Sequence, residues 1–86
     1  MRIIYQKRFQ KQQKKLQKHL KISVADAIDL FQENPHDPLL KNHLLQGMMK
    51  GKRSLSAGFD LRIIFEERNG YAIVLMIAVG THGDVY

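Results

Sequence analysis

The first 20 residues predict a strand followed by a helix. A β-branched run over residues 2–5 predicts an edge strand. Residues 6–20 are rich in Gln, Lys and Leu, which favour helix. The apolar positions in that segment are only Phe9, Leu16 and Leu20. Such a narrow stripe predicts a helix that touches the core along one line and exposes lysines elsewhere.

A second helix is predicted directly after the first. Ser23 is expected as its N-cap, with Asp26 in the acidic position of a capping box. Apolar residues then recur at helical spacing, at Val24, Ala27, Ile28 and Phe31. Asn34-Pro35 is expected to end the helix, because a residue before proline is driven out of the α region. The two helices are therefore expected to form an antiparallel hairpin.

The second half of the chain reads as a loop followed by three strands. Residues 34–49 are expected to be a loop, and residues 50–56 a polar strand. Residues 59–68 alternate between apolar and polar, and residues 71–79 are apolar throughout, as in a central strand. Asn69-Gly70 between them predicts a two-residue hairpin turn.

That turn predicts a register for the last two strands. Arg68 is expected opposite Tyr71, and Ile63 opposite Met76, with the apolar face against the helices. The predicted order is β-α-α-β-β-β, an antiparallel sheet with a helical hairpin on one face. The fold class is α+β, in a single domain that spans residues 1–86.

Charge changes this picture because it is uneven. The net charge is +6, yet the first 21 residues carry a formal +8 and no acid. A basic segment of this density favours a polyanionic partner. The chain has no cysteine, and no apolar run reaches the ~18–20 residues of a membrane helix. Its start lacks the apolar region of a secretory signal, so we expect a cytoplasmic location and no membrane partner.

Candidate chemistry gathers at one end of the predicted hairpin. The expected register places Asp60 and Arg62 on the face away from the helices, with His82 next to Asp60. The preceding turn is expected to bring Arg53 to the same end, and Tyr86 ends the chain there. A carboxylate, an imidazole, two guanidinium groups and a phenol would then meet without a metal-binding motif.

This combination suits cleavage of RNA, which supplies its own nucleophile in the 2′-hydroxyl. The enzyme must provide a base, an acid and cations for the charge that grows on the phosphate. Histidine transfers protons near neutral pH, arginine binds phosphate and tyrosine can stack on a base. His19 and His36 are expected to have no such role, and three phenylalanines are expected in the core: Phe31, Phe59 and Phe65.

Four sequence blocks carry a resemblance to a known family. The chain has H-x-L-x-G at residues 43–47, K-G-x-R-S at 50–54, D-L-R-I-I-F at 60–65 and G-T-H-x-D-x-Y at 80–86. In this order they resemble the RelE/ParE superfamily of bacterial type II toxins, and in particular its RelE–YafQ branch of mRNA interferases. The resemblance implies an endoribonuclease without a cofactor that cleaves mRNA in the ribosomal A site and is silenced by a cognate antitoxin.

The resemblance also implies site residues. In YafQ-like members, catalysis is attributed to histidines, an aspartate and a terminal aromatic, which match His43, Asp60, His82 and Tyr86. RelE-like members instead rely on basic residues, for which the candidates are Lys50, Lys52, Arg53 and Arg62. A further histidine of some relatives falls near Ser56 here. Which residue is the acid and which is the base stays open.

Two binding surfaces are expected. Ribosomal RNA is expected to bind a continuous basic strip on the first helix, made by Lys7, Lys11, Lys14, Lys15 and Lys18. An acidic, partly disordered antitoxin is expected to cover the basic segment and an exposed apolar set on the sheet face away from the helices: Ile64, Ile73, Leu75 and Ile77. Two alternatives compete with the nuclease, a ParE-like toxin that inhibits DNA gyrase without nuclease activity and a non-catalytic basic RNA-binding domain.

Overall fold

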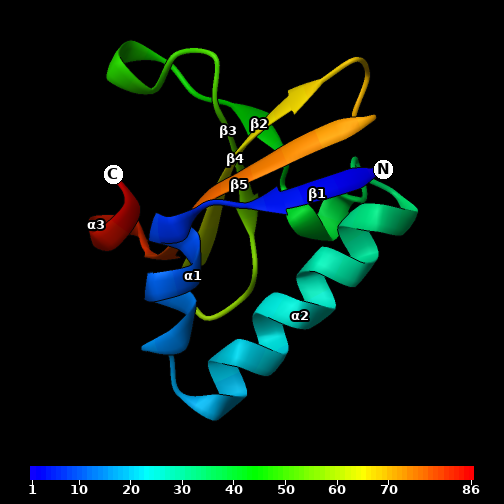
Figure 1. Ribbon diagram of the computed structural model, residues 1–86. Helices are drawn as coiled ribbons and strands as arrows, with labels where there is room; N and C mark the ends of the chain where they lie inside the picture. The colour runs from blue at the N-terminus through cyan, green and yellow to red at the C-terminus, as the bar shows by residue number, and fades with distance from the viewer.

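Five strands form one sheet that carries two helices on one face, as the computed structural model of all 86 residues shows (Figure 1). The strands lie in the order β1-β5-β4-β3-β2. They span β1 Arg2–Tyr5, β2 His43–Leu44, β3 Arg53–Ser56, β4 Leu61–Arg68 and β5 Ile73–Thr81. The helices span α1 Lys7–Lys14, α2 Lys18–Glu33 and α3 His82–Val85, with short 3₁₀ turns at Pro38–Leu40 and Gly47–Met49.

The α+β class and the edge position of β1 are confirmed. The sheet is mixed, however, because β1 runs parallel to β5 while the other pairs are antiparallel. Two short elements were not predicted from the sequence. β2 lies inside the expected loop, and α3 follows β5 at the end of the chain.

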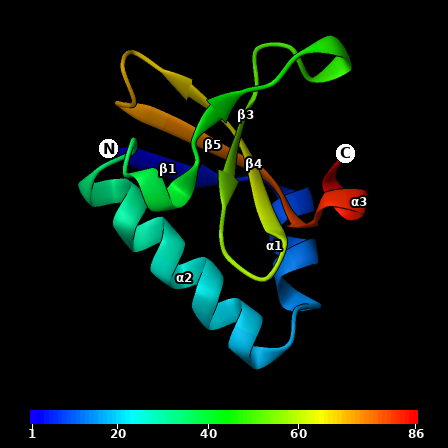
Figure 2. The ribbon, with the colours of Figure 1, turned by 180° about the vertical axis from the view of Figure 1, so that it is seen from behind.

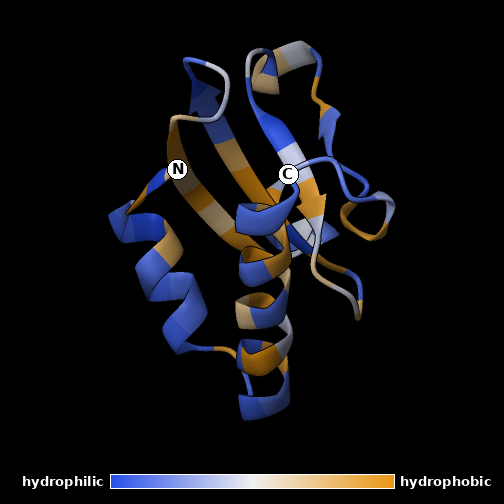
Figure 3. Ribbon diagram, turned by 90° about the vertical axis from the view of Figure 1, so that its right-hand side faces the viewer, coloured by the Kyte–Doolittle hydropathy of each residue, from blue (hydrophilic) through white to orange (hydrophobic).

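Both long helices cover the same face of the sheet, as predicted. They run in opposite directions (Figure 1), and Figure 3 shows them in front of the central, hydrophobic strands. Phe9 of α1 and Phe31 of α2 are fully buried in one core cluster with Ile63, Phe65 and Met76 of the sheet. None of the helices is long and apolar enough to span a bilayer.

The predicted start of the second helix is wrong, although its predicted end is confirmed. α2 begins at Lys18 and ends at Glu33, so Ser23 lies inside it. The chain bends earlier because Leu16 and Leu20 turn toward the core. The Ser23 hydroxyl donates a hydrogen bond to the carbonyl of Ala57. A serine that looked like a cap therefore ties α2 to the turn between β3 and β4.

The predicted hairpin register is also wrong. Arg68 pairs with Ile73, so the loop has four residues instead of two. Tyr71 joins the turn in a left-handed conformation (φ +69°), and its backbone N–H donates to Glu67 Oε1. Its ring packs against Phe31 at a centroid distance of 5.9 Å. Burial of Tyr71 thus outweighs the local preference of Asn-Gly for a two-residue turn.

A bulge shifts the register once more, between Ile64 and Phe65. Phe65 pairs with Met76, but Ile63 pairs with Val79 instead of the predicted Met76. Such bulges re-aim side chains and often lie near functional sites. Because of this one, Arg62 lies opposite Gly80, and β5 extends to Thr81 before the chain turns into α3.

Two predicted environments of apolar side chains are corrected. Phe59 is not in the core but is 69% exposed in the β3–β4 turn, whereas Phe31 and Phe65 are buried as predicted. Ile64 is fully buried on the other face of the sheet, against Val85 of α3. The rest of the expected exposed set is half-buried: Ile73, Leu75 and Ile77.

Candidate active site

The sheet face opposite α1 and α2 presents a row of aligned positions. His43 of β2 pairs with Ser54 of β3, Ser54 with Ile64 of β4, and Ile64 with Ala78 of β5. Directly paired residues project to the same face. Ile64 and Ala78 form the apolar floor of this face, and His43 and Ser54 continue it toward the β2 edge. His43 therefore lies on a strand, whereas the sequence analysis expected it in a loop.

α3 folds back onto this face and brings the end of the chain to the row. Val85 is buried against Ile64 and Ala78. The Tyr86 hydroxyl donates to Ser54 Oγ at 2.8 Å, and Ser54 is fully buried. The terminal tyrosine is thus attached to the residue that pairs with His43.

A capping box orders α3. Asp84 Oδ2 accepts hydrogen bonds from the Thr81 hydroxyl at 2.9 Å and from the Thr81 backbone N–H at 3.3 Å. Gly80 allows this fold-back, because a Cβ at that position would lie 2.9 Å from Asp84 Cβ. His82 begins the helix, and its ring lies 4.4 Å from that of Tyr86, centroid to centroid. Both rings are exposed at the protein surface.

His43 has a fixed tautomer. Its Nδ1 lies 2.8 Å from the carbonyl oxygen of Lys41. A carbonyl oxygen only accepts, so Nδ1 carries the hydrogen. In the neutral ring, Nε2 then holds a free lone pair, and the exposed side chain leaves that atom accessible. A histidine held this way is ready to accept a proton.

Arg62 and Asp60 lie together, but Asp60 does not reach His82. Arg62 Nη2 is 3.7 Å from Asp60 Oδ1, and Arg62 Nη1 donates to the Leu61 carbonyl at 3.0 Å. Asp60 lies in the turn before β4 (φ +62°), and its carboxylate makes no hydrogen bond to a histidine. Arg62 pairs with Ser56 of β3, on the same face as Ser54. The contact predicted between Asp60 and His82 is thus absent.

Arg53 belongs to the other face of the sheet. It alternates with Ser54 and shares its side with the buried Leu55. Its Nε donates to Asn42 Oδ1 at 2.8 Å, and the Asn42 amide donates to the Tyr71 hydroxyl at 3.0 Å. The expectation that Arg53 joins Arg62 at one end of the sheet is wrong, because Arg53 supports the loop before β2.

The remaining basic candidates do not form one strip. Lys52 forms an ion pair with Glu66 at 3.7 Å, and Lys50 is exposed. α1 ends at Lys14, so Lys14 and Lys18 lie on different helices and the predicted continuous strip is divided. The lysines themselves are all exposed: Lys7, Lys11, Lys14, Lys15 and Lys18.

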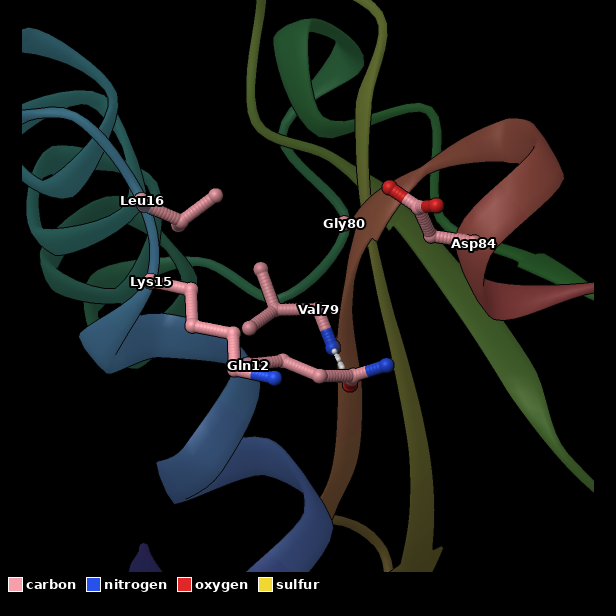
Figure 4. Close-up of a pocket in the computed structure, with 6 residues that line it drawn as sticks. All are labelled: Gln12, Lys15, Leu16, Val79, Gly80 and Asp84. Atoms are coloured by element: carbon pink, nitrogen blue, oxygen red, sulfur yellow. Dashed lines mark hydrogen bonds between the residues drawn. The ribbon is translucent and has the colours of Figure 1, made fainter.

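A pocket of about 330 Å³ separates the end of α1 from the α3 turn (Figure 4). Gln12 Oε1 accepts a hydrogen bond from the Val79 backbone N–H at 2.9 Å. Arg8 of α1 donates to the Asp84 carbonyl at 3.3 Å. Both contacts fix the end of β5 and α3, and hence the position of His82.

Three residues of this site were missed in the sequence. Ser54 carries no local signal, because its role depends on Tyr86, which is 32 positions away. Thr81-x-x-Asp84 does carry one, since it is a capping-box pattern. Its presence at the end of the chain predicts a helical turn that orients His82.

The fold matches solved toxin structures, whereas no protein-family model and no curated protein sequence matches this chain. YafQ from E. coli strain BL21(DE3) aligns with a TM-score of 0.83 and 24% identity, over 100% of this chain and 99% of that chain. A YoeB/ParE toxin from Agrobacterium tumefaciens aligns with a TM-score of 0.78 and 16% identity, over 95% and 99%. A chain of the E. coli DinJ-YafQ toxin-antitoxin complex aligns with a TM-score of 0.70 and 23% identity, over 98% and 94%. The protein therefore has the fold of these YafQ and YoeB/ParE structures.

Proposed function

We propose that this protein is the toxin of a type II toxin–antitoxin pair, an endoribonuclease that cleaves mRNA in the ribosomal A site without a metal. The observation that carries this proposal is the cluster on the sheet face opposite the long helices. There, His43 shares a row with Ser54, Ser54 binds Tyr86, and Tyr86 lies against His82. The RelE/YafQ-type fold supports the same reading, as do the matching sequence blocks.

His43 is the proposed general base. Its Nδ1 is committed to the Lys41 carbonyl, so Nε2 is free to take the proton of the RNA 2′-hydroxyl. The 2′-oxygen then attacks the neighbouring phosphorus. The bond from phosphorus to the 5′-oxygen breaks, which leaves a 2′,3′-cyclic phosphate on one fragment.

His82 is the proposed general acid. Its protonated imidazole gives a proton to the departing 5′-oxygen, which becomes a 5′-hydroxyl. The capping box of Thr81 and Asp84 orients the residue, and the ring of Tyr86 packs beside it. Tyr86 is anchored through Ser54, so its exposed ring face is available to a nucleotide base.

Arg62 is the proposed cation for the developing phosphorane charge. A guanidinium stabilises such charge through paired donors. Asp60 lies 3.7 Å away and holds Arg62 in place, so we assign it a positioning role instead of proton transfer. Lys50 and Lys52, on the neighbouring segment before β3, are proposed to bind flanking phosphates.

The proposed partners follow from charge. Ribosomal RNA binds the exposed lysines at the start of the chain, and each neutralised phosphate makes binding more sensitive to salt. An acidic antitoxin is proposed for the same segment, because a similarly folded chain occurs in the DinJ-YafQ toxin-antitoxin complex. Neutralising these lysines should weaken ribosome binding and reduce its salt dependence, with the rate on bound ribosomes unchanged.

The test is to add the protein to a purified translation system and map new mRNA ends, with and without ribosomes. We expect cuts only with ribosomes, at the A-site codon, and new fragments that begin with a 5′-hydroxyl. New 5′-phosphate ends would contradict the proposal, because they require water instead of the 2′-hydroxyl as nucleophile. Cleavage of free mRNA at the same rate would contradict the role of the ribosome.

A further inference from the structure

Phe59 is an exposed aromatic ring at the tip of the turn between β3 and β4. Its side chain is 69% exposed. Gly58, Phe59 and Asp60 all have left-handed backbones, with φ of +78°, +50° and +62°. Such a conformation is unusual for a bulky residue, and outliers of this kind cluster at functional sites. The backbone here presents the ring outward, although most of the apolar residues of β4 point into the core.

The ring is supported by the first turn of α2. His19 packs edge-on against Phe59, with centroids 5.6 Å apart and planes at 87°. The Ser23 hydroxyl binds the Ala57 carbonyl, so α2 and the turn are tied together beside this pair. Figure 2 shows the turn lying between α1 and α2. Phe59 and His19 thus form a fixed aromatic pair on the surface.

Positive charge lies on the His19 side of the pair. Lys15, Lys18 and Lys21 are exposed next to His19 along the chain, and no acidic residue occurs among the first 21 positions. On the other side, Phe59 is joined to Asp60, whose carboxylate contacts Arg62 of the candidate site. The aromatic pair therefore connects the basic start of α2 with the proposed catalytic face.

We propose that Phe59 and His19 form a stacking platform for an unpaired RNA base, a proposal that rests on the function proposed above and extends its substrate site. Aromatic rings flanked by cations are how proteins hold single-stranded nucleic acid, because every base has a π-face. A partner helix would instead need several apolar anchors at helical spacing along a groove. Ile22 is the one large apolar side chain of α2 that is exposed, so α2 offers no such row of anchors.

The test measures binding separately from cleavage. Ribosomes carry a fluorescent mRNA with a 2′-O-methyl group at the cleaved nucleotide, and binding of the protein is titrated. Phe59→Leu keeps an apolar side chain but removes the π-face, and we expect it to weaken binding about 5- to 150-fold. Phe59→Trp restores the ring and should bind within about threefold of the wild type. Leu39→Ala is the matched control, because Leu39 is an exposed apolar residue outside the pair (77% exposed).

Each outcome decides the platform independently of the nuclease. Equal binding by Phe59→Leu and the wild type would overturn the platform, even if the wild type cleaves mRNA normally. If Phe59→Leu and Phe59→Trp weaken binding equally, the platform is also overturned, because the tryptophan ring can stack on a base and the leucine side chain cannot. If the wild type binds with the expected Phe59 dependence but cuts no mRNA, the platform stands and the proposed nuclease fails. Loss of binding to an acidic protein partner alone, with RNA binding unchanged, would assign the surface to protein and refute the RNA platform.

Discussion

The hydrogen bond between Tyr86 and Ser54 should contribute measurably to the attachment of the chain end, and it can be tested by a double-mutant cycle. Tyr86→Phe removes the donor and leaves the fully buried Ser54 hydroxyl without its partner. Ser54→Ala removes the buried hydroxyl, whereas the Tyr86 hydroxyl, on a residue that is 45% exposed, regains water. The two single variants therefore differ, although they break the same bond.

The expected magnitudes follow from this asymmetry. An unsatisfied buried polar group costs about 1–3 kcal/mol, and a satisfied hydrogen bond contributes about 0.5–1.5 kcal/mol. We expect Tyr86→Phe to lose about 1–2 kcal/mol and Ser54→Ala about 0.5–1 kcal/mol. The double variant should lose less than the sum, because neither polar group is left behind. In a domain of 86 residues, each kcal/mol corresponds to about 4–8 °C in Tm.

The assay is thermal and urea unfolding of the four proteins, in the absence of any partner. A Tyr86→Phe variant as stable as the wild type would contradict this prediction, since it would mean that water reaches Ser54 or that α3 is detached in solution. Additive losses in the double variant would show that the two residues do not interact.

Three further predictions concern neighbouring features. Gly80→Ala should destabilise the protein by about 1–3 kcal/mol in urea unfolding, because its Cβ would lie 2.9 Å from that of Asp84; wild-type stability would mean that α3 packs elsewhere. Arg62→Gln should slow single-turnover cleavage while Arg53→Gln mainly lowers stability, and the reverse pattern would contradict the placement of the two arginines. Burial, and then the Asp29 carboxylate, raise the pKa of Tyr5, so the stability of the fold should fall as the pH rises above about 10. Tyr5→Phe should reduce this loss in Tm measurements at alkaline pH, and equal losses of Tm in the variant and the wild type would contradict the prediction.

Local signals in the sequence predicted most of the elements. Asn34-Pro35 ended α2 where expected, since the restriction before proline needs no tertiary contact. Period-two alternation identified β4 and placed Ile63 and Phe65 on the helix face. The register error is two residues at Phe65 and three at Ile63, and the bulge between them restores the alternation, so the predicted face is right although the pairing is wrong.

The errors arose where distant contacts outweigh local preference. Tyr71 belongs to the turn instead of β5 because its ring packs against Phe31 and its hydroxyl accepts a hydrogen bond from Asn42. Ser23 lies inside α2 instead of capping it, and its hydroxyl donates to the Ala57 carbonyl. Neither contact is visible in a window of a few residues.

Part of the candidate site was expected from the sequence, but its arrangement was not. His82, Tyr86 and Arg62 do lie on the face away from the long helices, as expected. β2 has only two residues, so no periodicity could place His43 on a strand beside Ser54. The bulge in the β4–β5 pair then moved β5 past the predicted register and set where α3 begins.

In the proposed function, this cluster cleaves RNA with His43 as its base. The most direct measurement is the single-turnover rate on ribosome-bound mRNA for His43→Gln, beside His36→Gln as a control. His36 packs against Tyr71 instead of lining the cluster, at a centroid distance of 5.3 Å. We predict that His43→Gln slows cleavage about 10²–10⁴-fold with ribosome affinity unchanged, while His36→Gln cleaves at the wild-type rate. Equal rates for His43→Gln and the wild type would contradict the account.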